Sequence, residues 1–255
     1  MAFTELLISP WLIAGLFFII AFIYSSVGLG GGSSYTALMA ILGFSTLAIP
    51  LVSLSLNLLV TTIGSFNFIR KKHASWPMIL PFLLTSMPMA YLGGALNLPK
   101  IVFYWLLLVS LLFVAARIYL WRDTSMHLNL SARGKFLVSL LAGSLLGLLA
   151  GIVGIGGGIY LVPLIIILGL GSHQQAAACG AIFVWLNSAA GLTSRLQYNA
   201  IDLSEYVPLI IAVLLGGGLG SYMGSTRFSS EKMEKVLGLI ILVAIGFLGR
   251  KLLFP

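Results

Sequence analysis

Charged residues are scarce in this chain. Only 8% of its 255 residues are Asp, Glu, Lys or Arg, and only six of them are acidic. An ordinary soluble domain has about 25% charged and about 45–50% apolar residues, whereas 60% of this chain is hydrophobic. A soluble protein of this size needs far more polar surface than these residues can supply. The composition therefore excludes a soluble enzyme and a disordered chain, and it indicates an all-α polytopic membrane protein.

Cysteine and histidine are also nearly absent. The single cysteine, Cys179, can form neither an internal disulfide nor a thiolate metal cluster, which excludes a disulfide scaffold. The histidines at positions 73, 127 and 173 fall at segment ends or in a polar loop, without the spacing of metal ligands. We therefore expect neither a metal site nor a cofactor. The net charge of +8 is interpreted as a signal of membrane topology rather than of nucleic-acid binding.

Two long runs of the sequence contain no charged side chain. They cover 64 residues between Glu5 and Arg70 and 59 residues between Lys135 and Arg195. A helix needs only about 20 apolar residues to span a bilayer, so each run holds several membrane segments. The first five residues lack the positive charge of a signal peptide, so the first segment is expected to be retained. The pattern predicts about eight membrane-inserted helical segments: 10–43, 47–69, 76–96, 101–121, 136–170, 174–194, 206–224 and 234–253.

Segments 10–43 and 136–170 are too long to be single straight helices. At 1.5 Å per residue the first would be about 50 Å long, against a bilayer core of about 30 Å. Each segment contains a glycine cluster, at 28–32 in the first and at 154–158 in the second. Because consecutive glycines support a helix poorly, we predict that both helices are broken there.

The two glycine clusters belong to an internal repeat. Residues 27–43 and 153–169 match without gaps at 9 of 17 positions, and four of the matches are aligned glycines of the clusters. A shift of four residues then aligns Asn57 with Asn187. We predict two homologous halves, 1–121 and 136–255, joined by a central polar loop at 122–135. Transporters are commonly built from such halves, with the binding site at the repeat interface.

The motif G-x-G-G-G in a broken helix, present in both halves of a chain with about eight membrane segments, resembles the TauE/SafE sulfite exporter family. The copy at 154–158, followed by Pro163, Leu164 and Gly169, is the closer of the two. The resemblance covers the whole chain. It implies a multi-pass carrier of the bacterial inner membrane that moves small sulfur-containing anions such as sulfite or organosulfonates.

A broken membrane helix leaves backbone groups without partners, and these are tolerated only beside protein or a water-filled cavity. A helix that restarts after the break directs its free N–H groups and its positive dipole end at the break, which favours an anion there. Neutral serine and asparagine donors lie nearby in the sequence, and an arginine ends the second charge-free run. The predicted substrate-binding set is Ser25, Ser26, Gly28, Gly30, Gly31, Gly32, Ser33, Ser34, Asn57, Gly154, Gly156, Gly157, Gly158, Asn187 and Arg195.

Each part of that set has an alternative reading. The glycine clusters can serve as tight packing or hinge elements that touch no ligand. Asn57 and Asn187 can join helices through hydrogen bonds, and Arg195 can extend to the interface at a helix end. The rows Gly143-Gly147-Gly151 and Gly216-Gly220-Gly224 are assigned to tight internal helix packing rather than to a dimer interface.

The acidic residues indicate the sign of the transported charge. All six fall at segment ends or in loops, whereas cation sites and proton relays usually carry a carboxylate inside the membrane. We therefore predict a secondary carrier of small anions, embedded in the lipid bilayer. The alternatives are a channel-like anion pore of the same fold and an intramembrane enzyme or assembly factor. The enzyme is disfavoured because no reactive set of side chains lies within the segments.

The direction of the crossings is left open by the charges. If all eight segments cross the membrane, the halves are parallel; if the two broken segments turn back as hairpins, the halves are inverted. In both cases 10 of the 14 Lys and Arg residues share one face, which the positive-inside rule makes cytoplasmic. The length of the broken segments favours the inverted arrangement, which is the common basis of alternating access.

Overall fold

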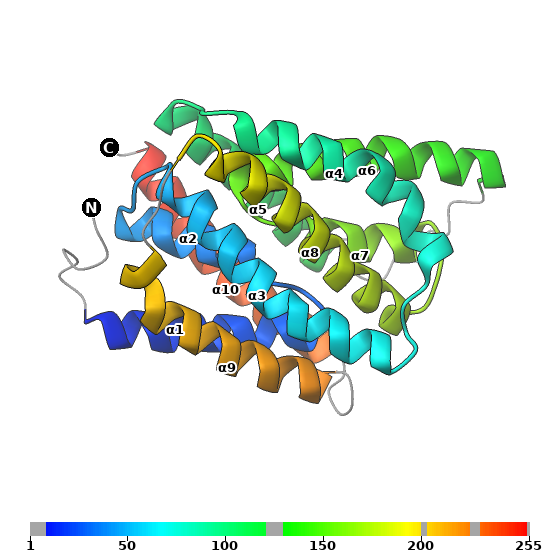
Figure 1. Cartoon of the computed structure of the whole chain (residues 1–255), viewed down its shortest axis with the longest axis horizontal. Helices are drawn as coiled ribbons and strands as arrows, with labels where there is room; N and C mark the ends of the chain where they lie inside the picture. Colours follow the sequence, from blue (N-terminus) through cyan, green and yellow to red (C-terminus); the bar gives the residue numbers. More distant parts are fainter. Residues whose placement is uncertain (1–8, 121–129, 200–202, 225–229, 254–255) are drawn as a thin grey trace.

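The structure is a computed structural model that describes residues 9–120, 130–199, 203–224 and 230–253. In these ranges the chain is helical, without strands. Figure 1 shows the helices as a bundle of mostly long, roughly aligned rods. The elements in order are α1 (Pro10–Ser26), α2 (Gly32–Leu42), α3 (Ala48–Arg70), α4 (Trp76–Ala95), α5 (Lys100–Leu120), α6 (Ala132–Val153), α7 (Gly158–Ile167), α8 (His173–Leu196), the 3-10 turn η2 (Leu203–Tyr206), α9 (Val207–Gly224) and α10 (Ser230–Leu253).

The described residues include seven helices that are long and apolar enough to cross a membrane. They are α3, α4, α5, α6, α8, α9 with the turn before it, and α10; the shorter apolar helices are α1, α2 and α7. The chain is therefore a multi-pass membrane protein, as the composition predicts. One predicted boundary is wrong, because α6 begins inside the expected polar loop. Its N-cap, Ser131, accepts a hydrogen bond from the Gly134 amide, which starts the helix four residues early.

Both predicted helix breaks are present. The first separates α1 from α2 and the second separates α6 from α7. Gly31 and Gly157, the residues before the two short helices, have φ values of 97° and 81°, a region that other residues rarely adopt. The glycine clusters are thus the cause of the breaks.

The two glycine rows pack helices together inside the molecule. A methyl group on Gly143, Gly147 or Gly151 of α6 would overlap the backbone or a side chain of α4, and one on Gly216, Gly220 or Gly224 of α9 would overlap the backbone of α1. This confirms the assignment to internal packing. The leucines of α6 at positions 137, 141 and 145 are exposed, as expected for a face that meets lipid.

These close contacts also give the directions of the helices. Gly143 meets Phe82 and Gly151 meets Ala90, so α4 and α6 run in parallel, and the contacts of α9 with Phe18 and Phe22 show the same for α1 and α9. Beyond the end of α2, the ring of Phe44 lies 6.3 Å from that of Tyr206, just before α9 begins. The α1–α2 segment therefore returns to the side on which it starts.

The α6–α7 segment does the same at the other end of the molecule. Gly171, which follows α7, lies against the side chain of Met78 at the start of α4, level with the start of α6. Both broken segments are thus hairpins, and α3, α4, α5, α8, α9 and α10 run from one end of the bundle to the other (Figure 1). A common ancestry of the two halves, and their bounds, stay predictions.

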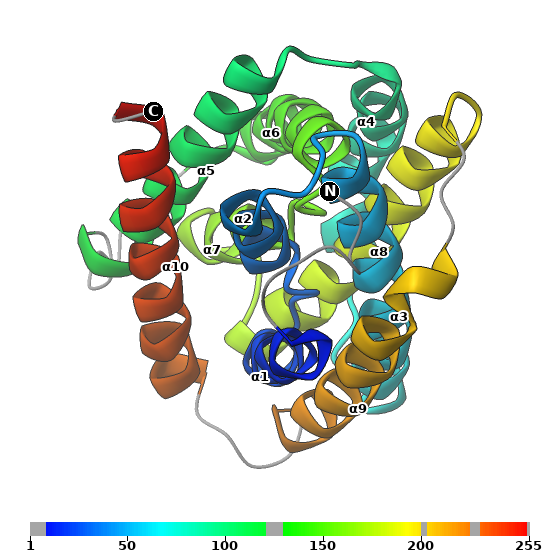
Figure 2. The same ribbon diagram turned by 90° about the vertical axis from the view of Figure 1, so that its left-hand side faces the viewer.

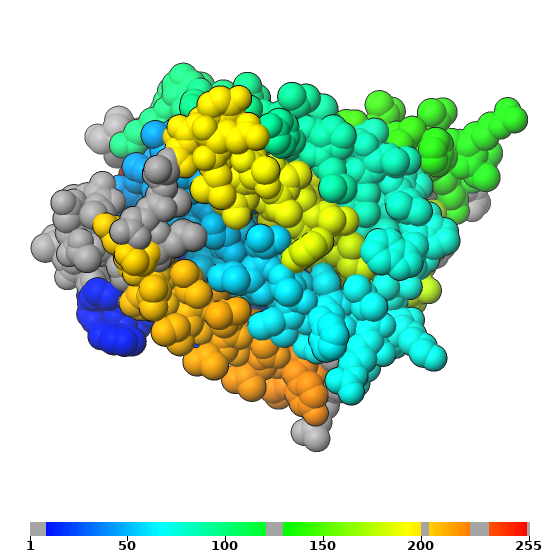
Figure 3. All heavy atoms as spheres, viewed as in Figure 1, coloured from blue at the N-terminus to red at the C-terminus, as the bar shows by residue number. Residues whose placement is uncertain are grey.

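The short helices α2 and α7 lie in the interior of the bundle. Viewed along its long axis, the longer helices surround them (Figure 2). On one side α3 packs against both α8 and α9, and the space-filling view shows their side chains in contact over this face (Figure 3). The fold therefore places the first turns of both short helices away from lipid.

Candidate functional site

The two helix breaks meet at the middle of α3. A methyl group on Gly30 would lie 2.5 Å from Oδ1 of Asn57, and one on Gly32 would lie 2.6 Å from the carbonyl oxygen of Ile155. A methyl group on Gly156 would lie 3.1 Å from Nδ2 of the same asparagine. The N-termini of α2 and α7 therefore converge on Asn57, a buried side chain that touches both breaks. We call this region the central site.

Both breaks leave backbone amides without acceptors. In the first, the N–H groups of residues 30–33 donate no hydrogen bond to any described residue, and Ser34 is the first to do so, at 3.1 Å to the Gly31 carbonyl. In the second, the same holds for residues 155–159, and Tyr160 donates at 3.1 Å to the Gly157 carbonyl. Each helix N-terminus carries about half a positive charge from its aligned peptide dipoles. The central site is thus rich in donors and electrically positive.

The side chains at the central site are polar but uncharged. Asn57 donates through Nδ2 to the Gly154 carbonyl at 3.4 Å, and Ser53 donates to the same oxygen at 2.8 Å. The Asn57 Oδ1 atom is enclosed and has no partner, and the same is true of the Ser188 hydroxyl, which lies 3.2 Å from the methyl position of Gly156. Buried polar groups of this kind are costly unless something satisfies them.

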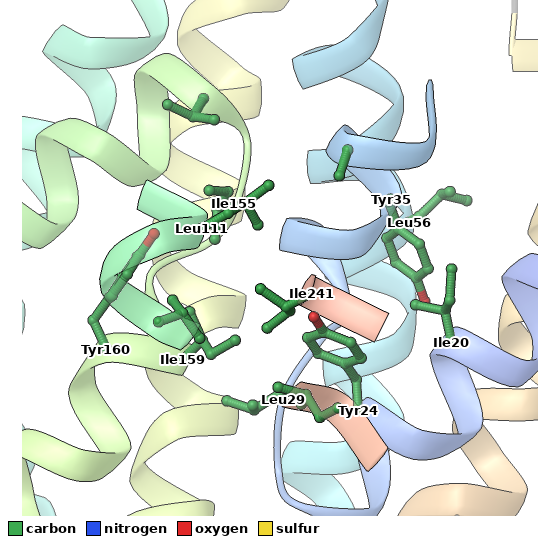
Figure 4. Packing of buried hydrophobic residues seen from close by; sticks show 14 of the residues in the cluster. Ile20, Tyr24, Leu29, Tyr35, Leu56, Leu111, Ile155, Ile159, Tyr160 and Ile241 are labelled. Atoms are coloured by element: carbon green, nitrogen blue, oxygen red, sulfur yellow. The ribbon is translucent and has the colours of Figure 1, made fainter. Parts of the chain in front are cut away.

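Tyrosines contribute hydroxyl groups that the sequence analysis missed. The Tyr24 hydroxyl lies 2.7 Å from both the Ser33 and the Ser34 hydroxyl oxygens, so it joins the end of α1 to the start of α2. The hydroxyl of Tyr35 is enclosed and has no partner among the described residues. The Tyr35 ring stacks on the Phe17 ring, with the two ring centroids 5.0 Å apart. Figure 4 shows Tyr24 near Ile241, with Ile155 and Ile159 of the second break on the other side of Ile241. A tyrosine inside an apolar run needs a hydroxyl partner, and this signal could have identified these residues.

Several predicted residues lie elsewhere. Ser26 donates to the Ile23 carbonyl of its own helix, and Asn187 donates to the Phe183 carbonyl of α8. Ser25 faces α9, and Gly28 packs against the backbone of Ala177 near the start of α8. The structure therefore brings Asn57 to the breaks together with Ser188, the neighbour of the predicted Asn187.

Arg195 lies near the second break but not at the amides that lack acceptors. It is 3% exposed and ends α8. Its guanidinium donates to the carbonyls of Gly151 and Ile152, in the last turn of α6. An arginine in this position satisfies carbonyls that have no partner in their own helix.

Two pockets lie at opposite ends of the bundle. The first meets both breaks, through Leu29 and Ile159, and the second lies at the end of α6, just before the second break. The first is lined by Val27 and Leu29 together with residues near the start of α8, and its empty volume out to open solvent is about 450 Å³. The second is lined by Ile152 and Arg195 at the end of α8, and its volume measured in the same way is about 240 Å³. Asn57 lines neither pocket, so the central site is closed from both.

Within the described part of the chain, no group of three or more His, Cys, Asp or Glu side chains could hold a metal ion. The site can therefore offer backbone amides, hydroxyls and amide groups to a ligand. All of these can donate a hydrogen bond, which suits an oxyanion.

Comparison with known proteins gives a consistent result. A model of the family described as "Sulfite exporter TauE/SafE" matches residues 13–248. A probable membrane transporter protein, y4hK, of Sinorhizobium fredii is 34% identical over 244 residues, which cover 93% of this chain and 96% of the relative. Probable membrane transporter proteins of Xylella fastidiosa and Methanocaldococcus jannaschii are each 27% identical, over 87% and 84% of this chain and 89% and 83% of the relatives. No solved structure matches the chain.

Proposed function

Because the chain belongs to the TauE/SafE sulfite exporter family, we propose that it is a secondary transporter that carries small anions, such as sulfite or organosulfonates, across the cell membrane. The family and the relatives' names make it a membrane transporter and not an enzyme. The substrate class is our proposal and depends on the chemistry of the central site.

The unpartnered amides of the two breaks are the main support for an anionic substrate. Two half-helix N-termini face one another across Asn57, and N–H groups in this position favour negative charge. A discontinuous membrane helix whose positive end points at the substrate is a common way for transporters to bind an anion. The substrate would be held by the amides of residues 30–33 and 155–159, with the Ser188 hydroxyl and the Asn57 amide group beside them.

The two pockets support a carrier rather than an open pore. One pocket meets both breaks from one end of the bundle, the other reaches the end of α6 from the opposite end, and Asn57 of the central site lines neither. For a substrate to pass, the hairpins must move relative to α3 and α8, first towards one pocket and then towards the other. A carrier should therefore show saturable flux and counterflow in vesicles, whereas a pore of the same fold would show ohmic current.

Asn57→Asp tests the central site with a change of only one polar atom. A carboxylate between the two N-termini would occupy the positive field and repel an anion, so uptake of labelled sulfite or methanesulfonate by proteoliposomes should be lost. The matched control is Asn67→Asp on the same helix, where the side chain contacts Ser221 away from the breaks, and this variant should transport normally. Normal uptake by folded Asn57→Asp protein would refute the site.

A further inference from the structure

Arg195 is a cation buried in the bundle, in the last turn of α8. It is 3% exposed, and its guanidinium donates to the carbonyl oxygens of Gly151 and Ile152, at 2.8–3.3 Å. No carboxylate among the described residues pairs with it. Carbonyl dipoles at a helix C-terminus compensate part of a positive charge, but burying an unpaired ion remains costly.

One edge of the guanidinium is unused. Arginine has five N–H donors, and the bonds to Gly151 and Ile152 occupy the one on Nε and the two on Nη2. The Nη1 atom has no acceptor among the described residues and is not fully enclosed. It therefore meets the open space of the pocket that Arg195 lines together with Thr46 and Asn97.

We propose that this pocket is a second anion-binding site, where the free edge of Arg195 holds a small sulfonate or related oxyanion outside the closed central site. The inference rests on the proposed function, because it concerns the same class of solute. The two N–H groups of Nη1 can donate to the oxygens of one anion, and a partly enclosed site strengthens that charge-assisted pairing. Thr46 supplies a neutral donor in the same pocket, and Asn97 lies at its rim.

Capping α6 does not by itself explain a buried arginine. At the end of α2, Lys251 donates to the Ala40 carbonyl at 2.7 Å, so a half-buried lysine performs the same kind of contact in the other hairpin. A cap needs only a point donor near the last carbonyls. The burial of Arg195 and its free Nη1 group are more than a cap requires, and they suit a ligand with oxygen acceptors.

Cysteine modification tests the site directly. Asn97 is exposed, so Asn97→Cys in a Cys179→Ser background gives one reactive thiol at the pocket rim. The experiment compares the rates at which this thiol reacts with two reagents. One is the anionic sulfonatoethyl methanethiosulfonate, and the other is the cationic trimethylammonioethyl methanethiosulfonate. A unit charge nearby should favour the anionic reagent, so Arg195→Gln should lower the ratio of the two rates on the order of tenfold. Arg250→Gln, which removes an exposed charge near the same end of the bundle, should leave the ratio nearly unchanged.

Protection of the thiol of Asn97→Cys against modification tests whether methanesulfonate binds in the protein that retains Arg195. Methanesulfonate should slow the modification of Asn97→Cys in a saturable manner while Arg195 is present, and this protection should be lost in Arg195→Gln. Arg195→Lys keeps the charge but has a single nitrogen, which cannot both bind the α6 carbonyls and face the pocket, so this variant should retain only weak protection. An absence of saturable protection in the protein that retains Arg195, or equal protection in Arg195→Gln, would overturn the proposal.

The same assay separates this site from the central one. In Asn57→Asp, transport should be lost while methanesulfonate still protects the thiol of Asn97→Cys. If the protein that retains Asn57 shows this protection but transports no anion, the proposed function is rejected and the Arg195 site is kept. Loss of protection in Asn57→Asp would mean that a single site explains both results, and the second site would be rejected.

Discussion

At the scale of single residues, glycine has two separate roles in this molecule. In the breaks it allows a positive φ, and in the two glycine rows it allows helix backbones to touch. Residues of the rows need no unusual conformation, so substitutions there test packing alone.

Gly147→Ala should destabilise the protein. Its methyl group would overlap the backbone of Ser86 in α4, which cannot move as a side chain can, and overpacking of this kind costs about 1–3 kcal/mol. Gly246→Ala in α10 is the control, because a methyl group there meets nothing within 4 Å. Thermal unfolding in detergent should show a lower midpoint for the first variant only; equal midpoints would contradict the packing assignment.

The side chains at the central site show why the sequence located it only in part. Asn57 belongs to the predicted binding set and does contact both breaks. In the second half the contact is made by Ser188, one position beyond the predicted Asn187. A helix that is buried on most of its surface has no clear apolar face, so its rotation about its axis cannot be read from hydrophobic periodicity.

At the scale of helices, each broken segment is a hairpin with a positive end at the centre. The breaks were predictable because glycine is a local signal. Which groups faced each break was not, because this depends on how α2 and α7 pack against α3 and α8.

Gly31→Ala should reduce transport more than Gly43→Ala. Both residues have positive φ, so both substitutions carry a similar backbone cost of about 1–2 kcal/mol. A methyl group on Gly31 would also lie 2.6 Å from the Tyr35 ring beside the first break, whereas one on Gly43 meets nothing within 4 Å. Uptake normalised to the amount of protein in the membrane measures the difference. Equal uptake by the two variants would contradict a role of the first break in transport.

The charge of the two helix ends predicts a preference among substrates. Together they supply about one positive charge, and no charged side chain lies at the central site among the contacts described above. A monoanion would be balanced there, whereas a dianion would leave one charge uncompensated in a buried site. Competition assays should therefore show that methanesulfonate inhibits uptake of a labelled monoanion better than sulfate does; the reverse order would contradict this account.

At the scale of the whole molecule, the hairpins fix a topology that the charges could not. Both arrangements place 10 of the 14 Lys and Arg residues on one face, so only packing distinguishes them. In the structure the start of α1 and the end of α10 lie at the same end of the bundle (Figure 1), and loop 70–72 lies at the other end.

The topology predicts that the C-terminus is outside the cytoplasm. The face with most of the positive charge should be cytoplasmic, and α10 ends on the opposite face. Alkaline phosphatase fused after residue 255 should be active in cells, and green fluorescent protein at the same position should be dark. Fluorescence from the green fluorescent protein fusion would reject both this orientation and the inverted arrangement.

The pairing of α1 with α9 and of α4 with α6 also has a consequence for biogenesis. Each hairpin finds its close-packed partner in the other half of the chain. During synthesis α1 enters the membrane long before α9 has been made. The face of α1 that later packs against α9 must therefore first contact lipid or the insertion machinery. A ribosome that stalls in the second half would release a fragment whose α1 lacks its partner, and membrane proteases should degrade it even though every helix in it is inserted.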